Sequence, residues 1–225
     1  MYWSDILYFL TLILFVVSLI ISGTVKSRFK KYAKVRPANG MSGAEAAERI
    51  LRANGIYDVS IMPTRGMLTD NYNTTDKTLN LSEAVYNSRS VSAVAVAAHE
   101  CGHAIQDAQT YPLLMLRKNI APVCNIGSMG AYVSIFLGFS FSSSGLITIC
   151  AGLFFLIVLF NFITLQVEVV ASRRAMQHVE QLNLLTEDEY AYGKKVLTAA
   201  GMTYFISLVA SIVQFLRLIS LARRR

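Results

Sequence analysis

The sequence predicts a mainly α-helical membrane protein, with three to four membrane helices and a small α+β part with a short sheet outside the membrane. Hydrophobic residues make up 54% of its 225 residues and charged residues only 16%, whereas charged residues make up about a quarter of an ordinary soluble domain. Several apolar runs reach the roughly 20 residues that a helix needs to cross a bilayer. Between the first two runs, helix caps and short alternating stretches are typical of a folded domain.

The predicted membrane helices come from three long apolar runs and one less regular stretch. The first, within residues 1–23, has an acidic front and is followed by positive charge, the reverse of a cleaved signal peptide, so we expect an uncleaved anchor. Two runs within residues 119–166 are joined by a short turn rich in Ser, which predicts a transmembrane hairpin. Residues 201–225 carry a polar stripe at helical spacing. Such a helix either lies in the interface or is membrane-embedded with the stripe turned inward, and we favour the second. The three runs are Ile6–Ser22, Ile120–Phe139 and Leu146–Leu165.

Lysine and arginine lie on one side of the three predicted spans. They follow the first span, precede the second and follow the third, and none occurs in residues 1–5 or in the turn of the hairpin. By the positive-inside rule, residues 24–118 and those after about 166 are expected in the cytoplasm, and the protein in the plasma (inner) membrane. The net charge of +7 follows from this topology and from attraction to anionic lipid. We therefore expect the lipid bilayer, and no nucleic acid, as a partner.

Residues 24–118 are expected to fold into helices and a small sheet. Ser42 and Glu45 have the spacing of a capping box ahead of a helix over residues 44–53, and a buried helix is predicted over residues 91–106. Residues 167–200, after the third span, are predicted to form further cytoplasmic helices. Three short alternating stretches predict a β-hairpin or a three-stranded sheet, and these are residues 59–61, 67–69 and 78–81.

The pattern H-E-x-x-H occurs once, within the predicted 91–106 helix, at His99, Glu100 and His103. Residues four apart lie one above the other on a helix, so both imidazoles can reach one ion while Glu100 lies beside its water. This arrangement is typical of zinc hydrolases that cleave peptide bonds. Two unrelated surface histidines are disfavoured, because the helix is apolar on every side and buried imidazoles need partners. The motif predicts one Zn²⁺ per chain.

A catalytic zinc takes three protein ligands, so the third has to come from another part of the chain. Glu168 directly follows the third predicted span and emerges on the same side of the membrane as the motif, and we favour it. His178, ten residues further on, is the other candidate ligand. The competing interpretation of Glu168 is an ordinary interfacial carboxylate paired with Arg173 or Arg174.

With these residues in place, the sequence resembles the bacterial membrane-bound neutral zinc metallopeptidases of the YugP type, which are distantly similar to HtpX-like and CAAX-prenyl endopeptidases. The resemblance covers most of the chain and lies in five segments: residues 66–72, 79–86, 96–106, 111–117 and 167–175. It implies a multi-pass gluzincin with a zincin-like catalytic part. It also implies Glu100 as the catalytic base and three zinc ligands, which are His99, His103 and Glu168.

Two departures from the family pattern lie next to Glu168. Val170 stands where the family has an acidic residue, and Ser172 stands where HtpX-like relatives have Asp. Ser172, Asp107 or a backbone carbonyl are therefore the candidates to orient a zinc-bound imidazole. The candidates to stabilise the tetrahedral oxyanion are His178, Arg174 and Tyr72.

The predicted substrate is a polypeptide, a membrane or membrane-proximal protein cleaved at the cytoplasmic face. A substrate strand adding to the sheet edge within residues 67–81 would gain affinity through main-chain hydrogen bonds. Two alternatives stay open: a zinc-binding membrane protein that does not cleave, and a scaffold in which the motif is accidental. A transporter is disfavoured because the predicted spans hold no paired ionisable residues.

Overall fold

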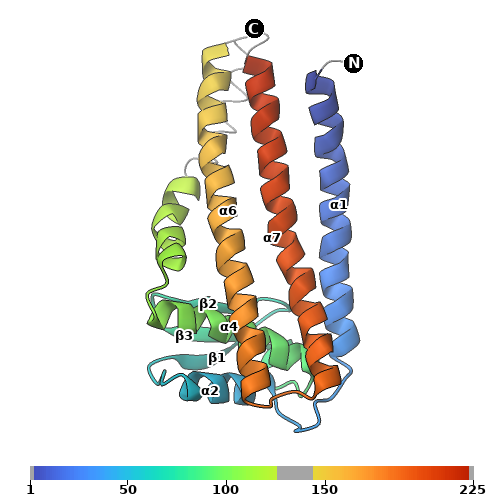
Figure 1. The fold of residues 1–225 in the computed structure, drawn as a ribbon, viewed down its shortest axis with the longest axis vertical. Coiled ribbons are helices and arrows are strands. Elements are labelled where there is room, and N and C mark those ends of the chain that lie inside the picture. The colour runs from blue at the N-terminus through green and yellow to red at the C-terminus, as the bar shows by residue number, and fades with distance from the viewer. Residues whose placement is uncertain (1–2, 126–143, 223–225) are drawn as a thin grey trace. The chain divides into compact units, whose positions relative to one another are not determined.

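The structure, a computed structural model, describes residues 3–125 and 144–222. A helix occupies residues 112–125, and the other elements are shown in Figure 1. They are α1 (Trp3–Tyr32), α2 (Gly43–Ala53), β1 (Ser60–Thr64), β2 (Asn71–Asn73), β3 (Thr78–Ser82), α3 (Glu83–Tyr86), α4 (Val91–Ala108), α6 (Ser144–Gln181) and α7 (Glu187–Ala222). The predicted fold class, mainly α with a small sheet, is confirmed.

The chain forms two compact units. The first, here called the helical unit, comprises Met1–Ile21, Met115–Gln166 and Thr203–Arg225. The second, here called the α/β unit, comprises Ser22–Leu114 and Val167–Met202. The sheet, α4 and the first part of the chain after Gln166 therefore belong to one unit, and the most apolar helical segments belong to the other.

Three of the described helices are long and apolar enough to cross a membrane: α1, α6 and α7. Within the helical unit, α7 packs on both of the others. Leu7 and Leu14 of α1 cluster with Ile206 and Val213 of α7, and a second cluster joins Cys150, Ala151 and Phe154 of α6 to Leu218 of α7. Many large apolar side chains of α1 stay exposed, Phe15 and Ile20 among them, as a lipid-facing surface requires. Of the predicted polar stripe on α7, Ser211 is buried but Ser207 is exposed.

The helices extend further than the apolar runs predicted. The third run ends at Leu165, but α6 continues to Gln181, and α7 is one helix from Glu187 to Ala222 where we expected separate ones. Backbone hydrogen bonds within a helix stay the same where the side chains become polar, so a change of composition need not end the helix. Asn183, at φ 48°, marks the true end of α6, since Asn tolerates the left-handed conformation. Most of the predicted second span and the hairpin turn lie outside the described residues.

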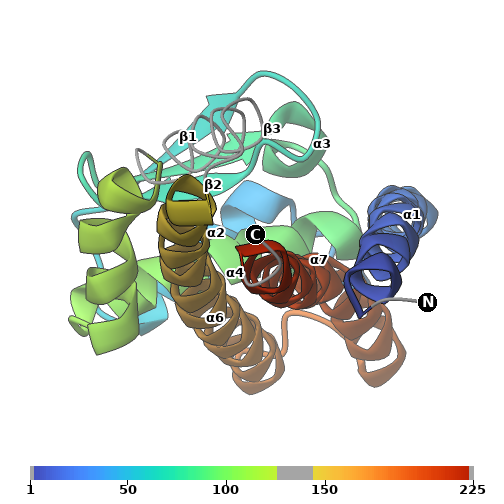
Figure 2. The same ribbon diagram turned by 90° about the horizontal axis from the view of Figure 1, so that it is seen from above.

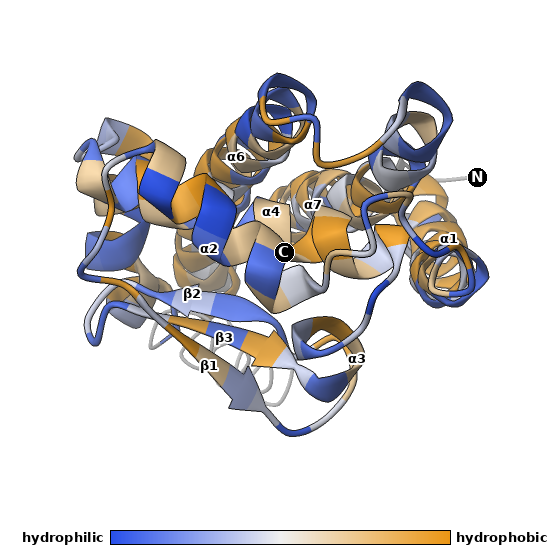
Figure 3. Cartoon of the chain, turned by 90° about the horizontal axis from the view of Figure 1, so that it is seen from below, coloured by the Kyte–Doolittle hydropathy of each residue, from blue (hydrophilic) through white to orange (hydrophobic). Residues whose placement is uncertain are grey.

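The sheet of the α/β unit has the strand order β1-β3-β2 (Figure 2). Strand β1 is parallel to β3, with Ser60 opposite Thr78, and β2 is antiparallel to it, with Asn71 opposite Asn80. Along β3, the buried side chains Leu79 and Leu81 alternate with polar residues. Figure 3 shows the three strands coloured by hydropathy. A three-stranded sheet was one of the two predicted arrangements.

One of the three predicted strands is wrong. Residues 67–69 form no strand, because the chain bends there with Gly66 at φ 105° and Leu68 at φ 59°. The second strand instead is the polar segment Asn71–Asn73, which we expected to be a connection. An edge strand keeps one side half exposed, so β2 does not need apolar residues at every second position. Its sequence therefore lacked the alternating pattern by which we predicted strands.

Helix α4 lies in the core of the α/β unit, as its apolar sequence predicted. The Ser90 side chain accepts from the backbone N–H of Ala93 at its start, and the predicted capping box of Ser42 and Glu45 begins α2. Apolar side chains from β3, α2, α6 and α7 join the same cluster as the alanines of α4. Representative members are Leu79, Ile50, Val179 and Val196. This packing fixes the position of α4 within the α/β unit, and α4 carries the histidine pair.

Candidate metal centre

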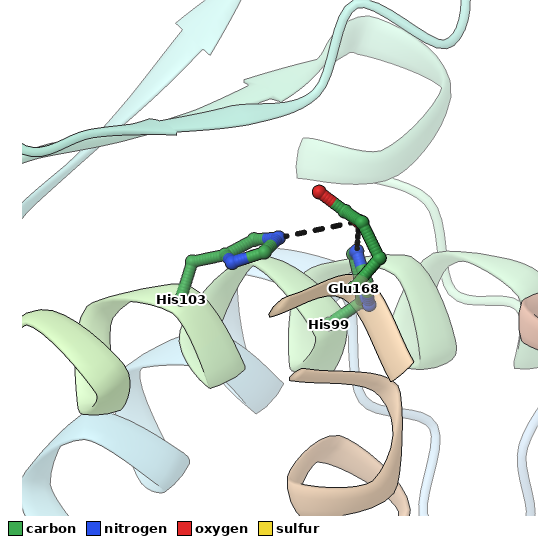
Figure 4. Close-up of side chains that lie close together, drawn as sticks. All are labelled: His99, His103 and Glu168. Atoms are coloured by element: carbon green, nitrogen blue, oxygen red, sulfur yellow. Dashed lines mark hydrogen bonds and ion pairs between the residues drawn. The ribbon is translucent and has the colours of Figure 1, made fainter. Parts of the chain in front are cut away.

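The candidate metal centre is formed by two helices of the α/β unit. His99 and His103 lie four residues apart on α4, and the chain returns with Glu168 on α6. Figure 4 shows the Glu168 carboxylate facing both imidazoles. Its Oε2 lies 3.2 Å from Nε2 of His99 and 3.5 Å from Nε2 of His103. The structure therefore places Glu168, and not His178, beside the histidine pair.

The spacing of these three groups fits a zinc ion. Zinc–nitrogen and zinc–oxygen bonds of about 2.0–2.2 Å in a tetrahedron place neighbouring ligand atoms roughly 3.4 Å apart. The two distances to Glu168 lie on either side of that value, and all three ligand atoms lie within 4.8 Å of one another. Two imidazoles and one carboxylate are also a donor set that catalytic zinc uses. Within residues 3–125 and 144–222, no fourth His, Cys, Asp or Glu joins this group.

Gly102 allows α4 and α6 to approach closely enough for this contact. A Cβ atom built on Gly102 would lie only 2.6 Å from the backbone oxygen of Ala171. Ala171 itself is fully buried and small, so the two backbones touch one turn away from Glu168. The absence of a side chain at this position thus brings the carboxylate within reach of the imidazoles.

Both imidazoles are held at their second nitrogen by uncharged groups. The Ser172 hydroxyl lies 3.1 Å from Nδ1 of His99, so one predicted support candidate does contact a histidine. Nδ1 of His103 lies 3.0 Å from Oε1 of Gln106, a residue that sequence analysis missed. Gln106 lies three residues after His103 and therefore on the same helix face. An amide within an otherwise apolar helix was the feature of the sequence that could have identified it.

Asp107, the other predicted support, has different partners. Its carboxylate accepts a hydrogen bond from the Tyr72 hydroxyl at 2.8 Å and pairs with the Lys77 ammonium. It thereby ties β2 and the following turn to the end of α4. Among the described residues, Asp107 thus joins two elements of the α/β unit, in place of the predicted contact with a zinc-binding imidazole.

Glu100 is buried beside the histidines. Burial raises the pKa of Glu100 to about 7, although the neighbouring His99 and a hydrogen bond from the Tyr72 backbone act in the opposite direction. A carboxylate with a pKa near neutrality is suited both to accept and to return a proton. Strand β2 thus contributes to the site through its backbone, which sequence analysis did not foresee.

The three predicted oxyanion-stabilising residues occupy different places. The Tyr72 hydroxyl is directed to Asp107, and burial together with that bond raises the pKa of Tyr72. Arg174 donates to Oε1 of Gln109 at 2.7 Å and lies over the ring of Tyr111. His178, ten residues after Glu168, is about 15 Å further along α6 at 1.5 Å per residue. For each of them the oxyanion role stays a prediction.

The chain is similar to known proteins over most of its length. Residues 7–223 match the family described as "Putative neutral zinc metallopeptidase". The chain is also 44% identical, over 195 residues and 87% of each chain, to "Putative membrane protease YugP" of Bacillus subtilis (strain 168). No solved structure matches the chain.

Proposed function

This chain belongs to the neutral zinc metallopeptidase family that it matches over residues 7–223, and from that membership we propose that it is a membrane-integrated zinc metalloendopeptidase. Its proposed substrates are membrane or membrane-proximal proteins, cleaved at the cytoplasmic face. The observation that carries the proposal is the convergence of two imidazole nitrogens and one carboxylate oxygen at the spacing of tetrahedral zinc. A buried carboxylate, Glu100, lies beside them.

The proposed roles of the residues follow from their positions. His99, His103 and Glu168 would hold the metal, which when bound polarises the scissile carbonyl and lowers the pKa of water. Glu100 would accept a proton from the attacking water and return it to the leaving amine. Its elevated pKa supports this role, because a base poised near neutrality can do both steps in one turnover.

The proposed cytoplasmic orientation rests on the positive-inside rule. The lysines and arginines nearest to the apolar segments lie after the first of them, before the second and after the third. These same stretches lead into the parts of the chain that form the α/β unit. The site would therefore face the cytoplasm, at the membrane surface.

The sheet offers a place for an extended substrate segment. Strand β2 is an edge strand, and the backbone of its Tyr72 lies beside Glu100. A peptide that pairs with this edge would gain main-chain hydrogen bonds close to the catalytic carboxylate. We propose β2 as the edge that the substrate uses.

The experiment that tests the function is Glu100→Gln in the full-length protein, with Glu180→Gln, an exposed position on α6, as the matched control. Chelator-sensitive self-cleavage or casein cleavage is measured together with the zinc content. We expect Glu100→Gln to keep zinc and lose cleavage, because the amide cannot accept the proton, and the control to keep both. Full cleavage by Glu100→Gln would refute the assignment.

A second candidate function is a zinc-binding membrane protein without proteolytic activity. It is favoured by one observation: serine and glutamine, and no carboxylate, contact the second nitrogens of the histidines, where carboxylates often strengthen zinc ligands. Stoichiometric zinc without chelator-sensitive cleavage by the unmodified protein would support it.

A further inference from the structure

We propose that Gln106 is a positioning residue for the metal centre: its amide fixes the tautomer of His103 and at the same time ties α4 to the turn of α6 that carries Glu168. The proposal rests on the zinc site of the proposed function. It concerns a residue outside the ligand set, which acts through His103 and through the α6 backbone.

Both ends of the Gln106 amide are used, and one end determines the other. Its Nε2 lies 2.9 Å from the carbonyl oxygen of Val167. A carbonyl can only accept a hydrogen bond, so the end of the amide that faces it is the NH₂ group. The amide oxygen is then the end that faces Nδ1 of His103, at 3.0 Å.

This orientation dictates where His103 carries its proton. The amide oxygen can only accept, so Nδ1 of His103 must be the protonated nitrogen. Nε2, the atom that faces Glu168, is left with a free lone pair, which is the form that binds a metal. The amide therefore prepares His103 for the metal before any metal arrives.

The second hydrogen bond couples the two helices of the site. Val167 directly precedes Glu168 in the chain, and both residues are buried. Gln106 thus joins a ligand on α4 to the backbone next to the ligand on α6. An ionised carboxylate at position 106 could accept from His103, but it would have no proton to donate to Val167. An amide meets both requirements at once, and Gln106 is fully buried so that water does not compete for either bond.

The test compares Gln106→Met with Gln106→Glu in the full-length protein. Met keeps the approximate size and removes both hydrogen bonds, whereas Glu keeps an acceptor for His103 whatever its protonation state. We expect Gln106→Met to weaken zinc binding about 10- to 100-fold, the usual effect of losing a partner of a metal-binding histidine, and Gln106→Glu to recover a large part of that loss. Zinc affinity is measured by chelator competition, and thermal stability of the metal-free proteins is measured in parallel.

The matched control is Gln109→Met, which removes an amide that also joins α4 to α6, through Arg174, but contacts no imidazole. It should bind zinc as the unmodified protein does. The proposal is overturned if Gln106→Met binds zinc with unchanged affinity. It is also overturned if the Met and Glu variants lose affinity equally and in proportion to their stability, which would indicate a role in folding alone.

A measurement on the unmodified protein keeps the proposal testable if a variant does not fold. The chain has only three histidines, so their ring nitrogens can be assigned by ¹H–¹⁵N spectra of the metal-free protein. We expect His103 as the Nδ1–H tautomer, and the Nε2–H tautomer would overturn the proposal. Failure of the unmodified protein to bind zinc would refute the proposed function, while this spectrum would still test the action of Gln106.

Discussion

Substitution of Gly102 by alanine tests whether the contact between α4 and α6 assembles the metal centre. The new Cβ would lie 2.6 Å from the Ala171 oxygen and 3.1 Å from its carbonyl carbon, both backbone atoms that cannot rotate away. Ordinary van der Waals contact begins at 3.4 Å, and tightly packed atoms do not interpenetrate. The two helices must therefore separate locally by about 0.8 Å, the difference between 3.4 Å and the 2.6 Å distance to the Ala171 oxygen.

That displacement is large compared with what a metal site tolerates. Ala171 lies three residues after Glu168 on the same helix, so moving it carries the carboxylate away from the imidazoles. Metal–ligand distances typically stay within about 0.2 Å of their ideal values. Overpacking of a buried contact costs about 1–3 kcal/mol. If zinc binding has to supply that energy, the affinity falls by roughly 5- to 150-fold, at 1.4 kcal/mol for each factor of ten.

The assay is chelator competition for zinc on the purified full-length protein, with thermal unfolding of the metal-free protein measured alongside. Gly201→Ala is the control, because a Cβ at Gly201 would meet nothing within 4 Å, and it should leave zinc affinity unchanged. We expect Gly102→Ala to bind zinc more weakly and to unfold at a lower temperature. Unchanged affinity and stability would refute the argument that this close approach positions Glu168.

Three further predictions concern Glu168, Asp70 and Ser42. Glu168→Ala should lose stoichiometric zinc, because two imidazoles alone leave the ion without its third protein ligand; metal analysis measures this. Burial raises the pKa of Asp70 despite its hydrogen bonds from Ser82, so the folded protein holds that proton more tightly than the unfolded chain does. The resulting stability is fully present below the unfolded pKa of about 3.9 and is lost as the pH rises through the folded pKa. Asp70→Asn should therefore gain thermal stability relative to the unmodified protein as the pH rises from about 4. Ser42→Ala removes the capping box of α2 and should lower the free energy of unfolding by about 1 kcal/mol.

Each of these has a result that would contradict it. Unchanged zinc stoichiometry in Glu168→Ala would remove that residue from the ligand set. A difference in unfolding temperature between Asp70→Asn and the unmodified protein that does not vary between pH 4 and 7 would show that Asp70 titrates alike in both states. An unchanged unfolding free energy for Ser42→Ala would mean that water replaces the cap without loss.

The parts of the fold that sequence predicted well depend on neighbouring residues. The capping box of Ser42 and Glu45 acts across one helical turn, and the pair His99 and His103 shares a face because residues four apart always do on a helix. The apolar run of α4 predicted a buried helix, and the helix is buried. Strand β2 escaped prediction because its three polar residues form a strand only by pairing with β3.

The sequence by itself determined the class of this protein, its apolar helices, the histidine pair with Glu100, and Glu168 as the favoured third ligand. Only the tertiary structure decided how these residues meet. The backbone contact at Gly102, the Gln106 amide between His103 and Val167, and the Tyr72 backbone at Glu100 all join segments far apart in the chain. Periodicity and caps report on a residue's own helix or strand, whereas the distance between two helices is set by the side chains at their crossing.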